Sequence, residues 1–170
     1  TPSMVNAIRS QMFGDSQKKH FTIGINDDVT ASSIAYNDND NDEPSDSYCA
    51  IFFGLGSDGT VGANKNTLKI IGESTGQYVQ GYFVYDSKKS GSKTVSHLRF
   101  SKKSINAPYL IRKAQFVGCH YNEFINLSEL EKSIGEYCIL LINTASEPEN
   151  FWKTVPYSLW KTCHEKKVMV

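Results

Sequence analysis

A glycine-rich segment in the first half of the chain has the residue types and the spacing of an anion-binding turn. Gly54, Gly56 and Gly59 fit the pattern G-x-G-x-x-G, after an apolar run and before a segment of helical periodicity. Glycine lets the backbone turn tightly, and the start of a helix presents N–H groups and a positive dipole end to an anion. The spacing leaves two interpretations open: a nucleotide-type phosphate site, or a turn that only packs a helix.

Polar side chains in the following predicted helix favour the phosphate interpretation. Thr60, Asn64 and Lys65 lie in its first two turns and can donate hydrogen bonds. A helix terminus at an exposed site contributes about 0.3–1 kcal/mol to anion binding. We therefore expect the charge of Lys65 to matter as much as the backbone.

A basic turn further along the chain favours a phosphate site over a nicotinamide site. The nicotinamide pattern has an acidic residue about 20 positions after the glycines, which binds the ribose diol. Asp86 ends the next predicted strand but lies further along, and Lys88 and Lys89 follow it. Two ammonium groups suit a phosphate better than a bare diol. A solvated turn is the alternative for both lysines.

The elements that must position these residues alternate between strand and helix. Periodicity predicts an N-terminal helix that ends at Gly14, and then a strand with Phe21, Ile23 and Ile25 on one face. Further strands are predicted at 49–53, 78–85, 114–119, 137–142 and from 168 onward, an extended segment at 95–99, and helices at 60–73, 128–135 and 157–166. This order indicates an α/β fold: a three-layer α/β/α domain with a largely parallel, mixed central sheet.

The length indicates a single domain, residues 1–170. Because the chain starts at Thr1 without an initiator Met and ends on the apolar Val168-Met169-Val170, we expect it to be a fragment of a larger multidomain protein. The polar run 37–46 is predicted to be a disordered insertion. A net charge of +0 argues against broad attraction to nucleic acid or membrane. The four cysteines lie far apart without metal-ligand spacing, which predicts reduced thiols and no bound metal. No catalytic residue is predicted: Cys119 and His120 are neighbours in a strand and point to opposite faces, so they are not expected to form a nucleophile and base pair.

Longer blocks of sequence add a resemblance. The run 54–66, Gly-Leu-Gly-Ser-Asp-Gly-Thr-Val-Gly-Ala-Asn-Lys-Asn, resembles the signature of the gamma-type domain of pyruvate:ferredoxin and pyruvate:NADP⁺ oxidoreductases. Further blocks that fit this family are residues 25–30, 68–72, 82–91, 94–100 and 116–120. Together the blocks cover most of the chain.

The resemblance implies a role in the coenzyme A step of a larger enzyme. Such enzymes decarboxylate pyruvate on thiamine diphosphate with Mg²⁺, pass electrons through 4Fe–4S iron–sulfur clusters and transfer the acetyl unit to coenzyme A. The gamma-type domain carries neither the thiamine nor the clusters, and it holds coenzyme A over the thiamine cavity. Carried over by motif, the coenzyme A site comprises Gly56, Ser57, Asp58, Gly59, Thr60, Asn64, Lys65, Lys88, Lys89, Ser90 and Gly91.

The same resemblance implies partners. Other domains of the polypeptide would bind the thiamine and the clusters, a ferredoxin, a flavodoxin or a fused NADP⁺ reductase would accept the electrons, and the full enzyme would be a homodimer. The polar insertion suggests a eukaryotic microbe, hence the fused NADP⁺ form, in the cytoplasm or in a reducing organelle of an anaerobic eukaryote. The isolated domain is not expected to be catalytic. Two alternatives stay open: a degenerate gamma-type module with a structural or interaction role, and a nicotinamide-binding domain.

Overall fold

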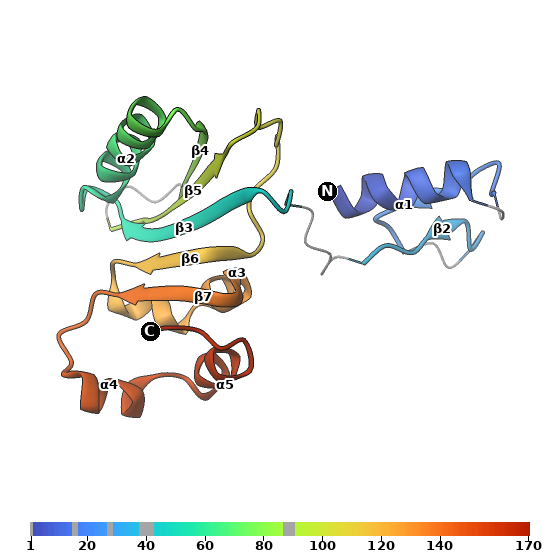
Figure 1. The fold of residues 1–170 in the computed structure, drawn as a ribbon. Helices are drawn as coiled ribbons and strands as arrows, with labels where there is room; N and C mark the ends of the chain where they lie inside the picture. Colours follow the sequence, from blue (N-terminus) through green and yellow to red (C-terminus); the bar gives the residue numbers. More distant parts are fainter. Residues whose placement is uncertain (1, 15–16, 27–28, 38–42, 87–90) are drawn as a thin grey trace. The chain divides into compact units, whose positions relative to one another are not determined.

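The chain forms two compact units, Thr1–Glu43 and Pro44–Val170 (Figure 1). The computed structural model describes residues 2–14, 17–26, 29–37, 43–86 and 91–170. Half of the predicted insertion, residues 38–42, lies outside the described residues. The assignment of residues 1–170 to a single domain stays a prediction.

The N-terminal unit consists of one helix and two short parallel strands. Helix α1 spans Pro2–Phe13, as its periodicity predicts, and β1 (Thr22–Ile23) pairs with β2 (Ser33–Ile34). The strand predicted through Ile25 is shorter than expected because Gly24 has φ 76°, which ends the extended backbone.

The C-terminal unit is built on a five-stranded sheet with the order β4-β5-β3-β6-β7 (Figure 1). Its elements are β3 (Ser47–Leu55), α2 (Thr60–Thr75), β4 (Tyr78–Tyr85), β5 (Lys93–Ser101), β6 (Ala114–Cys119), the 3₁₀ helix η1 (Asn122–Asn126), α3 (Ser128–Ser133), β7 (Ile134–Ile142), α4 (Pro148–Thr154) and α5 (Tyr157–Glu165).

The sheet is mixed, which confirms the predicted α/β fold. Strand β6 runs parallel to both β3 and β7. Strand β5 runs antiparallel to both β3 and β4. The β4–β5 connection is too short for a crossover, so these two strands form a hairpin. Strands β3, β4, β6 and β7 therefore share one direction, and β5 alone opposes them.

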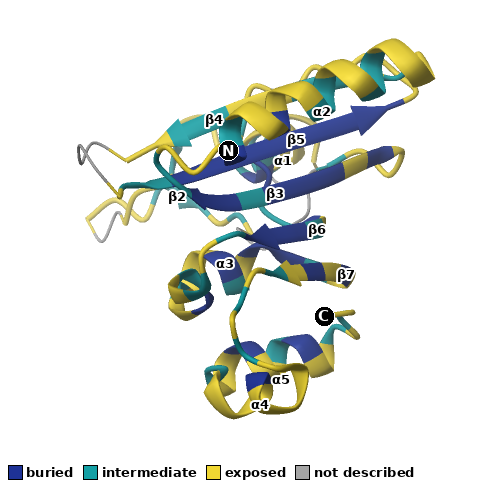
Figure 2. Ribbon diagram, turned by 90° about the vertical axis from the view of Figure 1, so that its left-hand side faces the viewer, coloured by how far each residue is buried: buried dark blue, intermediate teal, exposed yellow. Residues whose placement is uncertain are grey.

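Two apolar layers cover the faces of this sheet, as expected for a three-layer domain. On one face, Leu68 and Ile71 of α2 pack against a cluster that contains Leu98 and Phe100 of β5. On the other face, α3 and α5 pack on the larger core of β3, β6 and β7, where side chains such as Leu130 are fully buried. Figure 2 shows β5 buried along its length and the outward side of α2 exposed.

Some elements differ from the predictions. Helix α3 ends at Ser133, and β7 begins at Ile134, three residues earlier than predicted, with an irregular register opposite Ala114 and Phe116. The strand predicted from residue 168 is a single parallel bridge between Met169 and Ile139. Helix α4 was not predicted, because a seven-residue helix carries too little periodicity. No helix in the described part of the chain is long and apolar enough to span a membrane.

Candidate functional site

Four strand ends meet at one edge of the sheet. Because β3, β4, β6 and β7 share one direction, they end at the same side of the sheet, at Leu55, Tyr85, Cys119 and Ile142. Open α/β sheets bind ligands outside the carboxyl ends of their strands. The predicted glycine-rich turn follows β3 at this edge and leads into α2.

The turn depends on two of its glycines in different ways. At Gly54, a Cβ atom would lie 2.6 Å from Oγ1 of Thr60, so the strand end and the helix start approach too closely for a side chain. Gly59 precedes α2 with φ 89°, a left-handed conformation that favours glycine. Ser57 also has a positive φ, 73°, which is strained for a residue with a side chain.

Asp58 holds this turn together. Its Oδ2 accepts hydrogen bonds from the Leu55 N–H (2.8 Å) and the Thr60 hydroxyl (2.8 Å), and its Oδ1 accepts one from the Thr60 N–H (2.7 Å). Burial of the carboxyl group opposes ionisation, but the hydrogen bonds from Thr60 and Leu55 outweigh it and lower the pKa of Asp58. The carboxylate therefore serves the loop itself.

Asn64 and Lys65, one turn into α2, differ in their surroundings. Asn64 is 4% exposed, and its Nδ2 has no hydrogen-bond partner among the described residues. Leaving a buried donor unpaired costs about 1–3 kcal/mol, so this amide marks a place where a bound group would be stabilising. Lys65 is exposed, and its ammonium lies 5.4 Å from the ring centroid of Phe83 in β4.

The described residues just before β5 lie against the glycine-rich turn. The Gly56 N–H donates to the Ser92 carbonyl (2.7 Å), and the Asp86 N–H donates to the Lys93 carbonyl (3.1 Å). Gly91 has φ 66°. Three of the predicted site residues, Lys88, Lys89 and Ser90, lie outside the described residues. The site was predicted in two parts, the glycine-rich turn and the turn before β5. Their described residues Gly56 and Ser92 are thus adjacent.

The sequence analysis did not select His120, which follows β6 at the same edge. Its ring stacks on Phe52 with centroids 6.0 Å apart. Its position directly after a predicted strand was the signal that could have identified it. Cys119 is 1% exposed and lies in the core on the other face of the sheet, which α3 and α5 cover. Burial raises the pKa of its thiol to about 11. The side chains of Cys119 and His120 thus lie on opposite faces of the sheet, as the alternation along a strand predicts.

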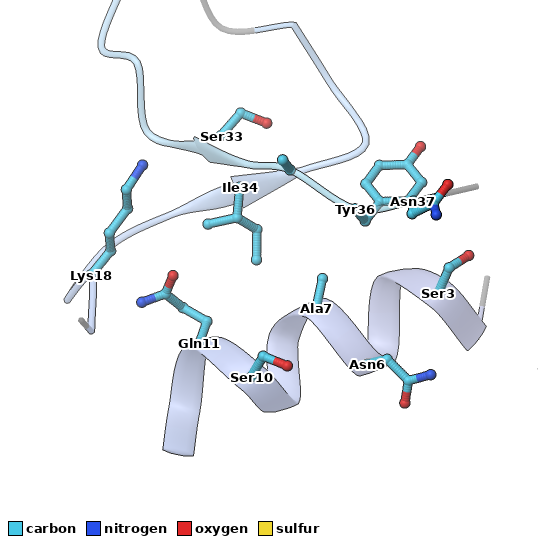
Figure 3. A pocket seen from close by; sticks show the side chains of 11 residues that line it. Ser3, Asn6, Ala7, Ser10, Gln11, Lys18, Ser33, Ile34, Tyr36 and Asn37 are labelled. Carbon is cyan, nitrogen blue, oxygen red and sulfur yellow. The ribbon is translucent and has the colours of Figure 1, made fainter. Parts of the chain in front are cut away.

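Residues of the N-terminal unit line two pockets, of about 550 and 670 Å³. The first lies between α1 and residues 33–37 (Figure 3). Its lining includes Lys18, whose ammonium donates to the Ala31 carbonyl (3.2 Å). Across the described ranges of both units, no three His, Cys, Asp or Glu side chains come together to hold a metal ion.

The protein is thus an α/β domain with a glycine-rich turn at the carboxyl ends of the parallel strands of its sheet. The sequence model of the family "Pyruvate ferredoxin/flavodoxin oxidoreductase" matches residues 49–168. The chain belongs to this family, which confirms the resemblance found in the sequence.

Proteins of several organisms are similar to the chain over nearly its whole length. The pyruvate-flavodoxin oxidoreductase of Trichormus variabilis is 48% identical over 170 residues, the pyruvate:ferredoxin oxidoreductase of Moorella thermoacetica 44% over 167, and the mitochondrial pyruvate dehydrogenase [NADP(+)] of Euglena gracilis 36% over 168. These matches cover 98–100% of the chain but only 14%, 14% and 9% of the three relatives. The chain therefore spans a small part of each relative.

A solved structure shares the fold. The pyruvate oxidoreductase subunit PORC of Thermotoga maritima matches 65% of this chain and 57% of its own, with a TM-score of 0.53 and 18% identity. At this identity the match supports the fold alone.

Proposed function

We propose that this chain is the coenzyme A-positioning domain of a pyruvate oxidoreductase, which forms acetyl-coenzyme A during oxidative decarboxylation of pyruvate. Membership of the family and the names of the relatives support the pyruvate reaction. The observation that carries the coenzyme A role is the buried, unpaired amide of Asn64, next to a glycine-rich turn at the edge where ligands of such sheets bind.

The chemistry of the edge suits the phosphates of coenzyme A. The glycine-rich turn brings backbone close to a ligand, Asn64 can donate through its amide, and Lys65 supplies a point charge. The Gly56–Ser92 hydrogen bond joins this turn to the segment in which Lys88 and Lys89 are predicted to bind a second phosphate. Holding the thiol at attack distance from the acetyl group would lower the entropic part of the barrier.

The rest of the enzyme is part of the proposal. Thiamine diphosphate, Mg²⁺ and 4Fe–4S clusters would be bound by other domains of the polypeptide and would supply the carbanion and electron-transfer chemistry. A ferredoxin, a flavodoxin or a fused NADP⁺ reductase would accept the electrons. The names of the relatives above contain flavodoxin, ferredoxin and NADP(+).

A titration with matched lysine variants tests the coenzyme A role. Lys65 and Lys69 are exposed lysines one turn apart on α2, and only Lys65 lies in its first two turns. Calorimetry on the whole protein is expected to show about tenfold weaker coenzyme A binding for Lys65→Met, because one charge-assisted contact is lost. Lys69→Met is expected to bind like the wild type.

Two outcomes would contradict the proposal. Equal effects of the two lysine variants would mean that Lys65 acts only through net charge. Tighter binding of NADP⁺ than of coenzyme A would favour the nicotinamide alternative. Weaker binding of dephospho-coenzyme A would locate part of the affinity in the 3′-phosphate.

A further inference from the structure

The end of β6 brings an imidazole beside the glycine-rich turn. Strands β3 and β6 are parallel, with Phe53 opposite Cys119. The next residues along, Gly54 and His120, are therefore neighbours on the same face of the sheet. The His120 N–H donates to the Phe53 carbonyl (2.9 Å), and Asn143, after β7, donates through Nδ2 to the His120 carbonyl (3.2 Å). Both adjacent strands thus fix the backbone of His120.

The side chain of His120 lies on the face that α2 covers. Its ring is nearly parallel to that of Phe52, at an interplanar angle of 22°, and Phe52 packs on Phe116 with centroids 5.4 Å apart. Gly118 makes room for this stack, since a Cβ there would lie 2.6 Å from the Phe52 ring. His120 is half-buried, and the stack restrains its ring.

Asp58 lies next to this imidazole. Its carboxylate sits over Gly54, where a Cβ would lie 2.9 Å from Oδ2. Burial raises the pKa of Asp58, hydrogen bonds from Thr60 and Leu55 lower it, and the nearby His120 lowers it further. A carboxylate at the start of a helix repels an incoming anion, and the imidazole beside it can give that anion an N–H donor.

We propose that His120 is a further ligand-binding residue, which donates a hydrogen bond from its imidazole to a phosphate group held at the start of α2. This inference rests on the proposed coenzyme A role. Lys65, which contacts Phe83 of β4, and His120, which follows β6, then stand on opposite sides of the turn. The phosphate would have a donor from each side, and the stacked ring would lose little freedom on binding.

The test compares coenzyme A with pantetheine, which lacks the phosphates. In His120→Phe, an aromatic ring stays on Phe52 but both ring nitrogens are lost. Calorimetry on the whole protein is expected to show about tenfold weaker binding of coenzyme A and unchanged binding of pantetheine. His120→Gln keeps a donor and is expected to recover part of the lost affinity.

The outcomes separate this inference from the proposed function. If His120→Phe binds coenzyme A like the wild type while Lys65→Met binds more weakly, the His120 inference fails and the coenzyme A role stands. An equal loss of affinity for pantetheine also overturns the inference, because packing would then be the cause. If the wild type binds no coenzyme A, both fail.

Discussion

At the scale of single residues, Asp58 decides the shape of the glycine-rich turn. It accepts three hydrogen bonds from Leu55 and Thr60, which link the end of β3 to the start of α2. A side chain that the motif suggests as a ligand contact is thus an internal brace. Its ionised form is the one that these donors stabilise.

Replacing Asp58 with Asn is expected to destabilise the domain in a pH-dependent way. The folded-state pKa is below the ordinary 3.8. The contribution of the carboxylate is therefore fully present above pH 3.8 and is lost as the pH falls through the folded-state pKa. Urea unfolding should show a loss of about 1–2 kcal/mol at neutral pH and a smaller difference in acid. If the difference in unfolding free energy between the wild type and Asp58→Asn grew in acid, the bracing role of the carboxylate would be contradicted.

Gly118 is expected to tolerate no side chain. Gly118→Ala would place a Cβ against the Phe52 ring, and the shift of that ring should cost about 1–3 kcal/mol of unfolding free energy. Gly62→Ala is the matched control: Gly62 is exposed in α2, and its Cβ would meet nothing within 4 Å. Gly62→Ala should be more stable than the wild type by about 0.5–1 kcal/mol. Chemical denaturation measures both variants, and equal stabilities would refute the packing argument.

At the scale of elements, β5 separates β3 from β4 and carries a buried cation. Arg99 is 1% exposed, and its guanidinium donates to Gln80 Oε1 of β4 (2.9 Å) and to the Tyr109 carbonyl (2.8 Å). It also lies 4.9 Å from the Tyr109 ring centroid. One planar group thus ties the β4–β5 hairpin to the segment that leads into β6.

Arg99→Lys is expected to weaken this tie even though it keeps the charge. An ammonium group cannot reproduce the planar fork that reaches both acceptors and stacks on the ring. The expected loss is about 2–3 kcal/mol of unfolding free energy, measured by urea denaturation. Lys102→Arg, at an exposed position near the end of β5, is the control and should change stability little. Similar values for the two variants would show that Arg99 acts only through its charge.

At the scale of the whole molecule, the core of the C-terminal unit encloses all four cysteines. Their exposures are 0% for Cys49, 1% for Cys119, 0% for Cys138 and 6% for Cys163. Burial raises the pKa of the last three thiols to about 11. The native thiols should be inert for two reasons. Reagents cannot reach the buried sulfur atoms, and a raised pKa keeps a thiol protonated although the thiolate is the reactive form.

Thiol labelling therefore reports on unfolding of this unit. With a disulfide reagent at mildly alkaline pH, the native chain is expected to react slowly, and the denatured chain is expected to release four equivalents rapidly. Labelling should rise along the same urea curve as tryptophan fluorescence. A thiol that reacts quickly before unfolding would show that a core segment opens locally.

Local patterns predicted much of the fold. Helical and strand periodicity located α1, α2, α5, β4 and β6 closely, because each of these elements expresses its own buried face in its sequence. The β5 strand was foreseen as extended but not its place between β3 and β4, because pairing joins residues far apart in the chain. Short α4 and the early start of β7 were missed, since neither has a strong local signal.

By itself, the sequence determined the family, through long blocks such as 54–66. It also determined the α/β class and the position of the glycine-rich turn, because the order of periodic segments and the spacing of glycines are local information. Only the tertiary structure decided which side chains surround the turn. The burial of the Asn64 amide depends on how α2 packs on the sheet, and the approach of His120 depends on the register of β3 and β6. More than fifty residues of sequence separate β3 from β6, so no local pattern encodes the approach of His120.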